Sequence, residues 1–413
     1  MNNLRQTTVI LLLTVITGWG CASLPFPHRG DRPRMQPSDF SVFLQEFEAS
    51  SPEKQERLAW SFIQQVKWRG GTPLFDSTNV VFLAWNSQPL SLSGMPTQWH
   101  TVSMQRLGST PLQFYRQQVP EDSRFEYVLV DEFMTSYRDP LNNNAWVKEG
   151  RGRSVVMMPG WREEPYVRER PEGVHGTVDT LAILSNSLGY TRYVFVYLPP
   201  KYDPLRTRPY PLFVVGDGYS AMIGGRITTV LDNLSADGKI DPPIALLLAT
   251  DEEHRWREYG GRREWRTFVV DDLLPEISSR YNITAQRDQT AIFGISRSGL
   301  MAADLALHQP ERFGLLAACS PALDLERSAI IEAYRRSTQL PLRSYVCLGY
   351  FETAAAPDVE QWVTLMKEKG GDVRYHRGHD GHSWFYWRTE LVPILTWFFP
   401  PVDTTGITYP EDG

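Results

Sequence analysis

Residues 289–300 constrain the fold most, because a short apolar run leads into a serine between small residues and then into a helical pattern. This order is typical of a strand-to-helix turn that exposes a nucleophile, where the positions two before and two after the serine must be small. Around Ser296 these positions are Gly294 and Ser298, although glycine is usual at the second. Ser298 as nucleophile would put Leu300 at a small position. We therefore predict Ser296 as the nucleophile, although an ordinary serine turn shares this signature.

The chain around this turn alternates between strand-like and helical patterns. The segments 210–215 and 244–250 are apolar without alternation, which is typical of strands buried on both faces. From residue 265 to residue 399, helical segments alternate with further apolar runs. This alternation predicts a doubly wound α/β sheet. Two alternating runs, 181–185 and 192–199, are expected to form a strand pair at its start.

A serine hydroxyl needs a base and an acidic residue that orients the base, and in α/β-hydrolase order the acid precedes the histidine. Glu352 follows a predicted strand closely, at the edge of the sheet where ligand-facing residues lie. Asp358 is the nearby alternative. Three histidines follow the next predicted strand, namely His376, His379 and His382.

The rest of the chain divides by pattern, and 413 residues predict more than one domain. Helical spacing of apolar residues predicts a helical segment at 38–70. Short alternating runs predict a small β-sandwich at 71–150. Residues 151–180 lack clear periodicity and carry many charges, so we predict a linker before an α/β domain at 181–402.

Residues 1–20 have the features of an export signal, namely Arg5, an apolar run and small residues before Cys21. The segment before Cys21 resembles a bacterial lipobox, although that motif prefers Leu three residues before the cysteine. A short apolar stretch ending at a lone cysteine favours a lipid anchor over a plain signal peptide or an uncleaved anchor. Residues 21–37, rich in Pro, Arg and Gly, predict a tether. We therefore expect an exported periplasmic or cell-envelope lipoprotein.

Composition excludes some partners. A net charge of −6 without a long Lys/Arg run argues against nucleic acid. The histidines lack paired Cys or Asp spacing, so no metal or other cofactor is expected. The 13 Trp and 18 Tyr suit either a sugar- or aryl-binding surface or large β-rich cores. Cys319 and Cys347 lie in apolar segments, as two buried thiols or as one disulfide.

Residues from about 180 to 400 resemble the esterase D and enterochelin esterase group of α/β-hydrolases. The stretch RYVFVYLPPKYD from Arg192, the Asp217-Gly218 loop and the Gly-His-x-x-x-x-Trp-Arg segment from Gly381 carry the resemblance. Ahead of them, the order of landmarks between Phe82 and Asn142 resembles an early-set immunoglobulin-like module akin to glycogen-binding domains. Such modules precede esterase domains in several bacterial enzymes, with a sugar-binding, substrate-shaping or structural role.

The resemblance implies a serine esterase mechanism. It selects His382 over His379 as the base, because the spacing from His382 to Trp387-Arg388 matches the family, and Glu352 would orient its imidazole. The backbone N–H groups of Arg297 and Tyr219 would hold the oxyanion. Substrate contacts are predicted at three residues, namely Asp217, Arg257 and Trp384. Of these, the arginine could instead form an ion pair, and the tryptophan could instead anchor the last helix.

We therefore predict a serine carboxylic-ester hydrolase that forms an acyl-enzyme on a carbohydrate-linked or siderophore-type ester. The alternative is an inactive ligand- or carbohydrate-binding lipoprotein on the same scaffold. Ser298, in place of the usual glycine, favours that alternative. The order of Ser296, Glu352 and His382 along the chain argues against it.

Overall fold

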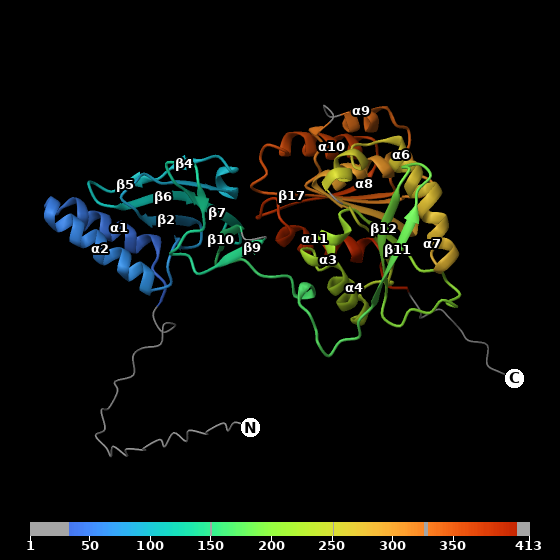
Figure 1. The fold of residues 1–413 in the computed structure, drawn as a ribbon, viewed down its shortest axis with the longest axis horizontal. Helices are drawn as coiled ribbons and strands as arrows, with labels where there is room; N and C mark the ends of the chain where they lie inside the picture. The colour runs from blue at the N-terminus through green and yellow to red at the C-terminus, as the bar shows by residue number, and fades with distance from the viewer. Residues whose placement is uncertain (1–32, 149–150, 251, 326–328, 403–413) are drawn as a thin grey trace, which may run out of the picture.

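The computed structural model describes residues 33–148, 151–250, 252–325 and 329–402. The predicted export signal and Cys21 lie outside these residues, as does most of the predicted tether. Figure 1 shows two parts, a smaller N-terminal one of helices and sheets and a larger α/β one. Among the described residues, no helix combines the length and the apolar character that crossing a membrane requires.

The N-terminal part begins with two helices, α1 (Pro37–Glu48) and α2 (Pro52–Trp68), each with a proline in its first turn. Proline fits there because the first N–H groups of a helix have no intrahelical partner. The rings of Phe43 and Phe62 stack across the two helices with centroids 4.1 Å apart. Phe40 packs edge-on against Phe114 of the neighbouring sheet. The helical segment thus covers one outer face of the β-structure.

Two antiparallel sheets follow. The first has the order β1-β2-β6-β5, and the second the order β4-β3-β7-β10-β9, with β8 paired to β7. Along β2, Phe82 faces the second sheet and Leu83 faces the helices, which is the alternation expected of a sandwich. The strands are β1 (Leu74–Phe75), β2 (Asn79–Trp85), β3 (Ser91–Gly94), β4 (Val102–Ser103), β5 (Gln105–Arg106), β6 (Leu112–Gln118), β7 (Arg124–Val130), β8 (Ser136–Tyr137), β9 (Ala145–Lys148) and β10 (Arg151–Met157).

The sandwich extends beyond its predicted end at residue 150. Strand β10 pairs with β7 and β9, so the predicted linker at 151–180 was wrong for its first seven residues. Arg153 is one of the charged residues that made this segment look like a linker. Its ion-pair partner Glu126 lies on the neighbouring strand β7, so the local sequence pattern does not reveal the pairing. The predicted linker also contains the 3₁₀ turn η2 (Pro165–Val167) and the start of β11 (Thr177–Leu184).

The larger part is the predicted doubly wound α/β fold. Its eight-stranded sheet has the order β11-β12-β14-β13-β15-β16-β17-β18. β11 and β12 form the predicted strand pair and run antiparallel, and the strands from β14 to β18 in this order run parallel. The remaining strands are β12 (Thr191–Leu198), β13 (Leu212–Val215), β14 (Ile244–Leu248), β15 (Thr290–Ile295), β16 (Leu315–Cys319), β17 (Arg343–Gly349) and β18 (Asp372–Gly378).

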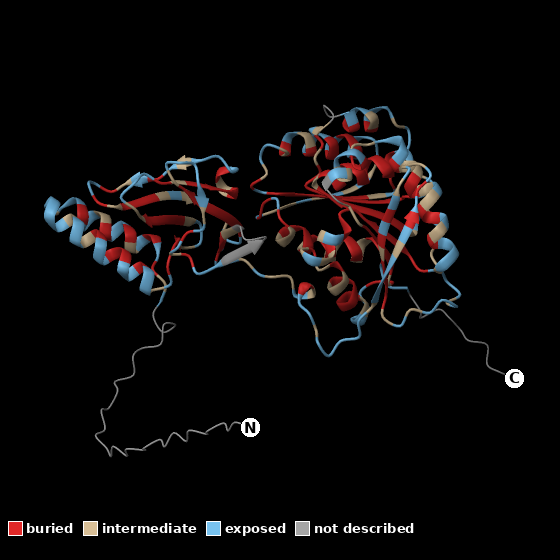
Figure 2. Ribbon diagram, viewed as in Figure 1, coloured by how far each residue is buried: buried red, intermediate tan, exposed pale blue. Residues whose placement is uncertain are grey.

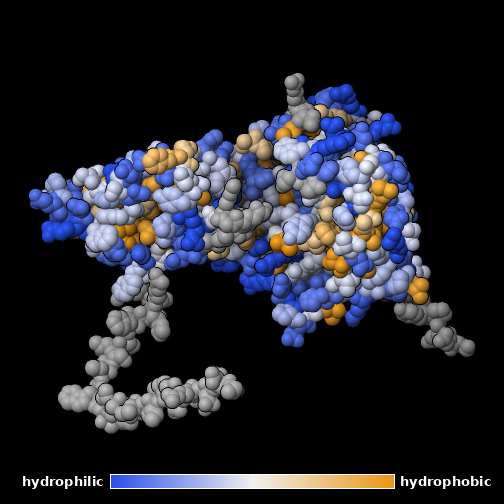
Figure 3. Space-filling model, viewed as in Figure 1, coloured by the Kyte–Doolittle hydropathy of each residue, from blue (hydrophilic) through white to orange (hydrophobic). Residues whose placement is uncertain are grey.

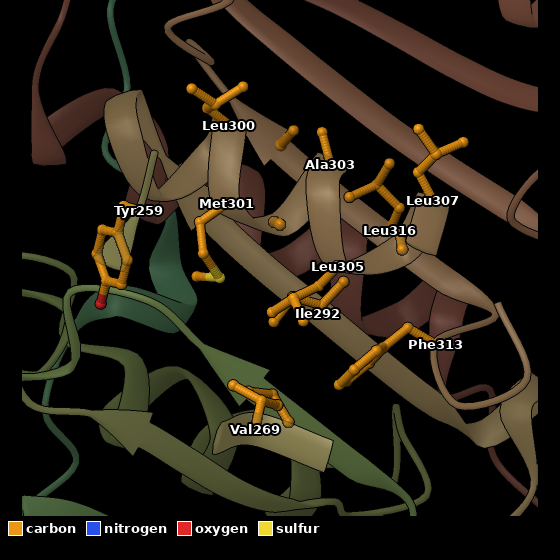
Figure 4. Close-up of a cluster of buried hydrophobic side chains, with 14 of the residues drawn as sticks. Tyr259, Val269, Ile292, Leu300, Met301, Ala303, Leu305, Leu307, Phe313 and Leu316 are labelled. Atoms are coloured by element: carbon orange, nitrogen blue, oxygen red, sulfur yellow. The ribbon is translucent and has the colours of Figure 1, made fainter. Parts of the chain in front are cut away.

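Helices cover both faces of this sheet, whose strands are largely buried (Figure 2). Side chains of α4 and α11 pack on one face, and those of α7, α8, α9 and α10 on the other. Figure 4 shows Leu305 of α8 beside Ile292 of β15 in a cluster that also contains Leu300 and Phe313. The helices are α3 (Gly218–Ile223), α4 (Ile227–Ala236), α5 (Glu252–Glu258), α6 (Arg263–Thr267), α7 (Leu274–Arg280), α8 (Ser296–His308), α9 (Ala329–Arg336), α10 (Ala356–Glu368) and α11 (Trp384–Phe398).

Cys319 and Cys347 lie opposite each other on β16 and β17 as buried free thiols. The disulfide alternative is therefore not realised. Burial raises the pKa of both thiols, which makes them poor nucleophiles.

Candidate active site

Ser296 is the first residue of α8 and follows β15 directly. Its φ of 51° lies in the left-handed region, which is uncommon for a residue with a side chain and occurs where functional turns hold strain. A Cβ on Gly294 would lie 1.9 Å from the carbonyl oxygen of Ser298, so only glycine fits there. The turn therefore has the geometry of the predicted nucleophile elbow, with Ser296 partly accessible at its tip.

Ser298 fills the usual glycine position because the neighbouring strand makes room for it. A Cβ on Gly216, the residue after β13, would lie 2.5 Å from the Cβ of Ser298. The close contact therefore requires glycine at position 216, and position 298 can carry a serine. The buried hydroxyl of Ser298 donates to Oδ2 of Asp217 at 2.8 Å and accepts from the N–H of Ile295 at 2.9 Å. The departure from the usual pattern is thus a built contact between the elbow and the loop after β13.

Glu352 and His382 lie at the carboxyl ends of β17 and β18, and the structure brings them together. Nδ1 of His382 lies 2.7 Å from Oε2 of Glu352, and since a carboxylate only accepts, Nδ1 donates. The other oxygen, Oε1, accepts from the hydroxyl of Ser320 at 2.5 Å and from the N–H of Gly349 at 2.9 Å. Asp358 lies instead in the first turn of α10.

Ser320 was missed by the sequence analysis. It follows β16 directly with a φ of 46°, and it accepts a 2.9 Å hydrogen bond from Nε1 of Trp387 while it donates to Glu352. The Trp387 ring in turn packs edge-on against His382, with centroids 4.7 Å apart. A polar residue directly after a predicted strand was the available signal. The N–H of Ala322 bonds to the carbonyl of Ser296 at 3.0 Å, so this loop also joins the elbow.

The other two histidines have different partners. His376 lies 2.8 Å from Glu390 of α11, and this hydrogen bond raises its pKa against the opposing effect of burial. His379 bonds to Asp122 of the sandwich. Within the described ranges, no group of three or more His, Cys, Asp or Glu side chains is arranged to hold a metal ion.

The two backbone groups predicted for an oxyanion hole occupy equivalent places. Tyr219 is the second residue of α3, after β13, and Arg297 is the second residue of α8, after β15. β13 and β15 are hydrogen-bonded neighbours in parallel register. N–H groups in a first helical turn have no intrahelical acceptor, so both helix starts offer donors at the same edge of the sheet.

The predicted substrate contacts fare differently. The carboxylate of Asp217 is buried and is held by Arg255 at 2.7 and 2.9 Å in addition to Ser298, which gives it a structural role, while its substrate contact stays a prediction. Arg257 is exposed on α5, whereas Arg255 of the same helix forms this ion pair. Trp384 packs over Gly224 and edge-on against Trp387, so it both anchors α11 and borders the His382 loop.

Aromatic side chains lie exposed near Ser296. The guanidinium of Arg297, the next residue, lies 3.9 Å from the ring centroid of Trp256, which is 58% exposed. Tyr219, at the start of α3, is 63% exposed. The face of the molecule shown in Figure 3 is mostly hydrophilic, with apolar residues in small groups. Exposed rings beside a candidate nucleophile offer a surface for an apolar or aromatic group.

A family model described as "Putative esterase" matches residues 185–398, just over half of the chain. The chain belongs to this esterase family. The family match ends at the last residue of α11 and contains the elbow, Glu352 and His382. It begins after the sandwich, so the N-terminal part lies outside the esterase family model.

Curated relatives share a quarter of their aligned residues with the chain. The iron(III) enterobactin esterase of Dickeya dadantii is 26% identical, across 88% of this chain and 97% of that protein. The endo-1,4-beta-xylanase/feruloyl esterase of Xylanibacter ruminicola is 25% identical, across 47% of this chain and 28% of that protein. The iron(III) salmochelin esterase of Escherichia coli is 25% identical, across 62% of this chain and 65% of that protein. The chain thus spans less than two thirds of the latter two relatives.

Solved structures show the same fold. The enterobactin esterase of Shigella flexneri has a TM-score of 0.65 at 20% identity, and that of Salmonella typhimurium has 0.67 at 17%. Each comparison covers 82% of this chain. It covers 97% of the Shigella flexneri chain and 98% of the Salmonella typhimurium chain. The covered share exceeds the esterase family match, so the likeness in fold extends into the N-terminal part.

Proposed function

We propose that the protein is a serine carboxylic-ester hydrolase in which Ser296 is the nucleophile, His382 the general base and Glu352 the residue that orients the base. The hydrogen bond from Nδ1 of His382 to Glu352 carries this proposal. With its proton on Nδ1, the imidazole keeps a lone pair on Nε2, which is the atom that must accept a proton from serine. Ser296, on a strained turn three strands away in the same parallel sheet, supplies the hydroxyl.

The reaction would proceed by acyl transfer. Ser296 Oγ attacks the ester carbonyl while Nε2 of His382 takes its proton, and the resulting imidazolium stays bonded to Glu352. Collapse of the tetrahedral intermediate releases the alcohol, which receives that proton and leaves an acyl-serine. A water molecule, activated by the same histidine, then hydrolyses the acyl-serine and frees the acid.

The oxyanion of each tetrahedral intermediate would accept hydrogen bonds from the N–H groups of Arg297 and Tyr219. Both belong to first helical turns, where the helix dipole also favours negative charge. One such donor contributes roughly 3 kcal/mol to transition-state stabilisation. Backbone donors explain why the side chains of these two residues are free to stack or to face solvent.

We propose a siderophore-type or carbohydrate-linked ester as substrate. The relatives' names support this class, since they describe esterases of iron(III) enterobactin, iron(III) salmochelin and feruloyl esters. The exposed rings of Trp256 and Tyr219 near the elbow suit an aromatic group on such an ester. The inactive binding protein is disfavoured, because Ser298 has a structural reason to replace glycine.

Trapping the acyl-enzyme tests this proposal. The protein is mixed with p-nitrophenyl acetate, quenched in acid within the first turnover and digested, and the peptide that contains residues 296–298 is fragmented in a mass spectrometer. We expect one acetyl group on Ser296 and none on Ser298. Turnover without an acetylated Ser296, or with the label on another residue, would contradict the proposed nucleophile.

We also propose that the mature protein is exported and held to a membrane through a lipid on Cys21. The support is the sequence of the first twenty-one residues alone. In a bacterial host, the full-length chain should fractionate with membranes and the Cys21→Ser chain should not. A Cys21→Ser chain that stays with the membranes would remove the lipoprotein proposal.

A further inference from the structure

The loop that carries Glu352 is anchored in the core of the N-terminal sandwich. Phe351, its neighbour in the chain, is buried among sandwich side chains and meets Phe125 of β7 edge-on, with centroids 5.7 Å apart. An aromatic residue from one part of a chain that completes the core of another cannot be withdrawn without leaving a cavity. The sandwich therefore holds the residue next to the proposed triad acid.

The loop that carries His382 is held by the same sandwich. The N–H of Arg124, at the start of β7, donates to the carbonyl of His379 at 3.1 Å. A Cβ on Gly381 would lie 2.8 Å from the sulfur of Met95, so the residue before His382 lies directly against the sandwich. In Figure 1 the segments that follow β17 and β18 extend toward the sandwich.

Arg124 makes the central contact between the two parts. Its guanidinium is buried, lies 3.6 Å from the ring centroid of Phe385 and pairs with Glu126 at 3.2 Å. Oδ2 of Asp380, two residues before His382, lies 3.8 Å from Nη1 of Arg124. Arg388 lies over the same Phe385 ring at 4.2 Å. A buried arginine needs such partners to offset its desolvation, so this is a built contact.

The two loops are also bonded to each other. The N–H of Tyr350 donates to the carbonyl of Gly378 at 2.7 Å, and that of Phe351 donates to the carbonyl of Asp380 at 3.2 Å. A displacement of either loop is thus passed to the other. The distance between Glu352 and His382 consequently depends on the sandwich through both loops.

From these contacts we infer that the N-terminal sandwich is a working part of the catalytic site, and that Arg124 is a positioning residue for the pair formed by Glu352 and His382. The inference rests on the proposed function. It differs from a recognition role, because a module that only binds substrate would affect large substrates and leave a minimal ester unaffected. A positioning role lowers the rate of the chemical step on every ester.

The test is steady-state hydrolysis of p-nitrophenyl acetate by the full-length Arg124→Met protein, which keeps an unbranched side chain but loses the charge and the planar guanidinium. We expect kcat to fall roughly 10- to 100-fold with KM nearly unchanged, because small misplacements of reacting groups have effects of this size. Arg124→Lys should recover part of the loss. The control is Arg116→Met, which removes an exposed guanidinium of β6 that lies over the ring of Phe40 of α1 and should leave kcat unchanged.

Phe385→Leu provides a second variant if Arg124→Met does not fold, because it removes the ring from the hydrolase side of the contact. It should lower kcat in the same way. A normal kcat in whichever variant folds would overturn the inference. A loss of kcat that disappears when the assay is cooled below the variant's thermal midpoint would also overturn it, because that loss would come from unfolding. Ser296→Ala separates the two proposals. An active Ser296→Ala protein refutes the proposed function, whereas an inactive one beside a fully active Arg124→Met protein refutes only the positioning role.

Discussion

Nδ1 of His382 donates a 2.7 Å hydrogen bond to Glu352, whose second carboxylate oxygen is held by Ser320 and by the N–H of Gly349. The side chain of Glu352 is 9% exposed and that of His382 is 46% exposed, so the imidazole is accessible while the carboxylate that holds it is shielded from solvent. This is the arrangement that a serine nucleophile requires of its base.

Loss of the charge on Glu352 should impair catalysis without unfolding the protein. We expect Glu352→Gln to lower kcat for p-nitrophenyl acetate by several powers of ten, on the order of the 10⁴-fold loss typical when a serine triad loses its acid. Asp358→Asn, in the first turn of α10, is the matched control and should remain active. If Asp358→Asn is the more damaging change, the acid is misassigned.

Ser320 should act through Glu352. Replacement by alanine removes one hydrogen bond to the carboxylate and leaves Nε1 of Trp387 without its acceptor. We expect kcat to fall about tenfold, equivalent to about 1.4 kcal/mol, with KM nearly unchanged. The measurement is steady-state turnover of p-nitrophenyl butyrate. An unchanged kcat would show that Gly349 and His382 alone hold the carboxylate.

Ser298 should matter for stability. Ser298→Ala leaves a buried oxygen of Asp217 with one donor fewer, which should cost about 1 to 3 kcal/mol of unfolding free energy in urea. Ser279→Ala, which removes an exposed hydroxyl on α7, is the control and should change the free energy by less than about 0.5 kcal/mol. Equal effects of the two substitutions would contradict the structural role of Ser298.

Asp380 should make stability depend on pH. Burial raises its pKa to about 7, against the opposing effect of Arg124. Below about pH 4 the carboxyl is protonated in both folded and unfolded chains. Between about pH 4 and 7 only the unfolded chain ionises, so this contribution to stability falls as pH rises, by at most about 4 kcal/mol, and is constant above pH 7.

Comparison with Asp380→Asn isolates that contribution. The unfolding free energy of the wild-type protein minus that of the variant, from urea titrations at several pH values, should decrease from pH 4 to pH 7 and then level off. A difference that stays flat or rises across this window would contradict the account.

Local patterns predicted the parts of the fold that depend on local chemistry. The elbow could be predicted because Gly294 of β15 lies against Ser298 in the first turn of the helix that follows it, α8. The sheet could be predicted because its buried strands lack alternation. Arg257 stays a prediction as a substrate contact, because its exposed position on α5 neither supplies nor excludes one. The ion pair between Arg255 of the same helix and Asp217 could not be predicted, because only the position of the helix in space decides which arginine reaches that carboxylate.

The contacts between the two parts were beyond such patterns. His379 meets Asp122 and Asp380 meets Arg124 across more than 250 residues of chain, so no periodicity relates them. Ser320 acquires its role from the left-handed turn after β16 and from Trp387 of α11, neither of which its neighbours in the sequence reveal. Residues whose function depends on such distant partners need a structure.

The rate of p-nitrophenyl acetate hydrolysis by Ser296→Ala, measured beside the wild-type protein at equal concentration and with matched circular dichroism, tests the central claim most directly. The account predicts that the variant folds normally and loses at least about 10³-fold in kcat, because the hydroxyl that forms the acyl-enzyme is gone. Equal rates for the two proteins would contradict it.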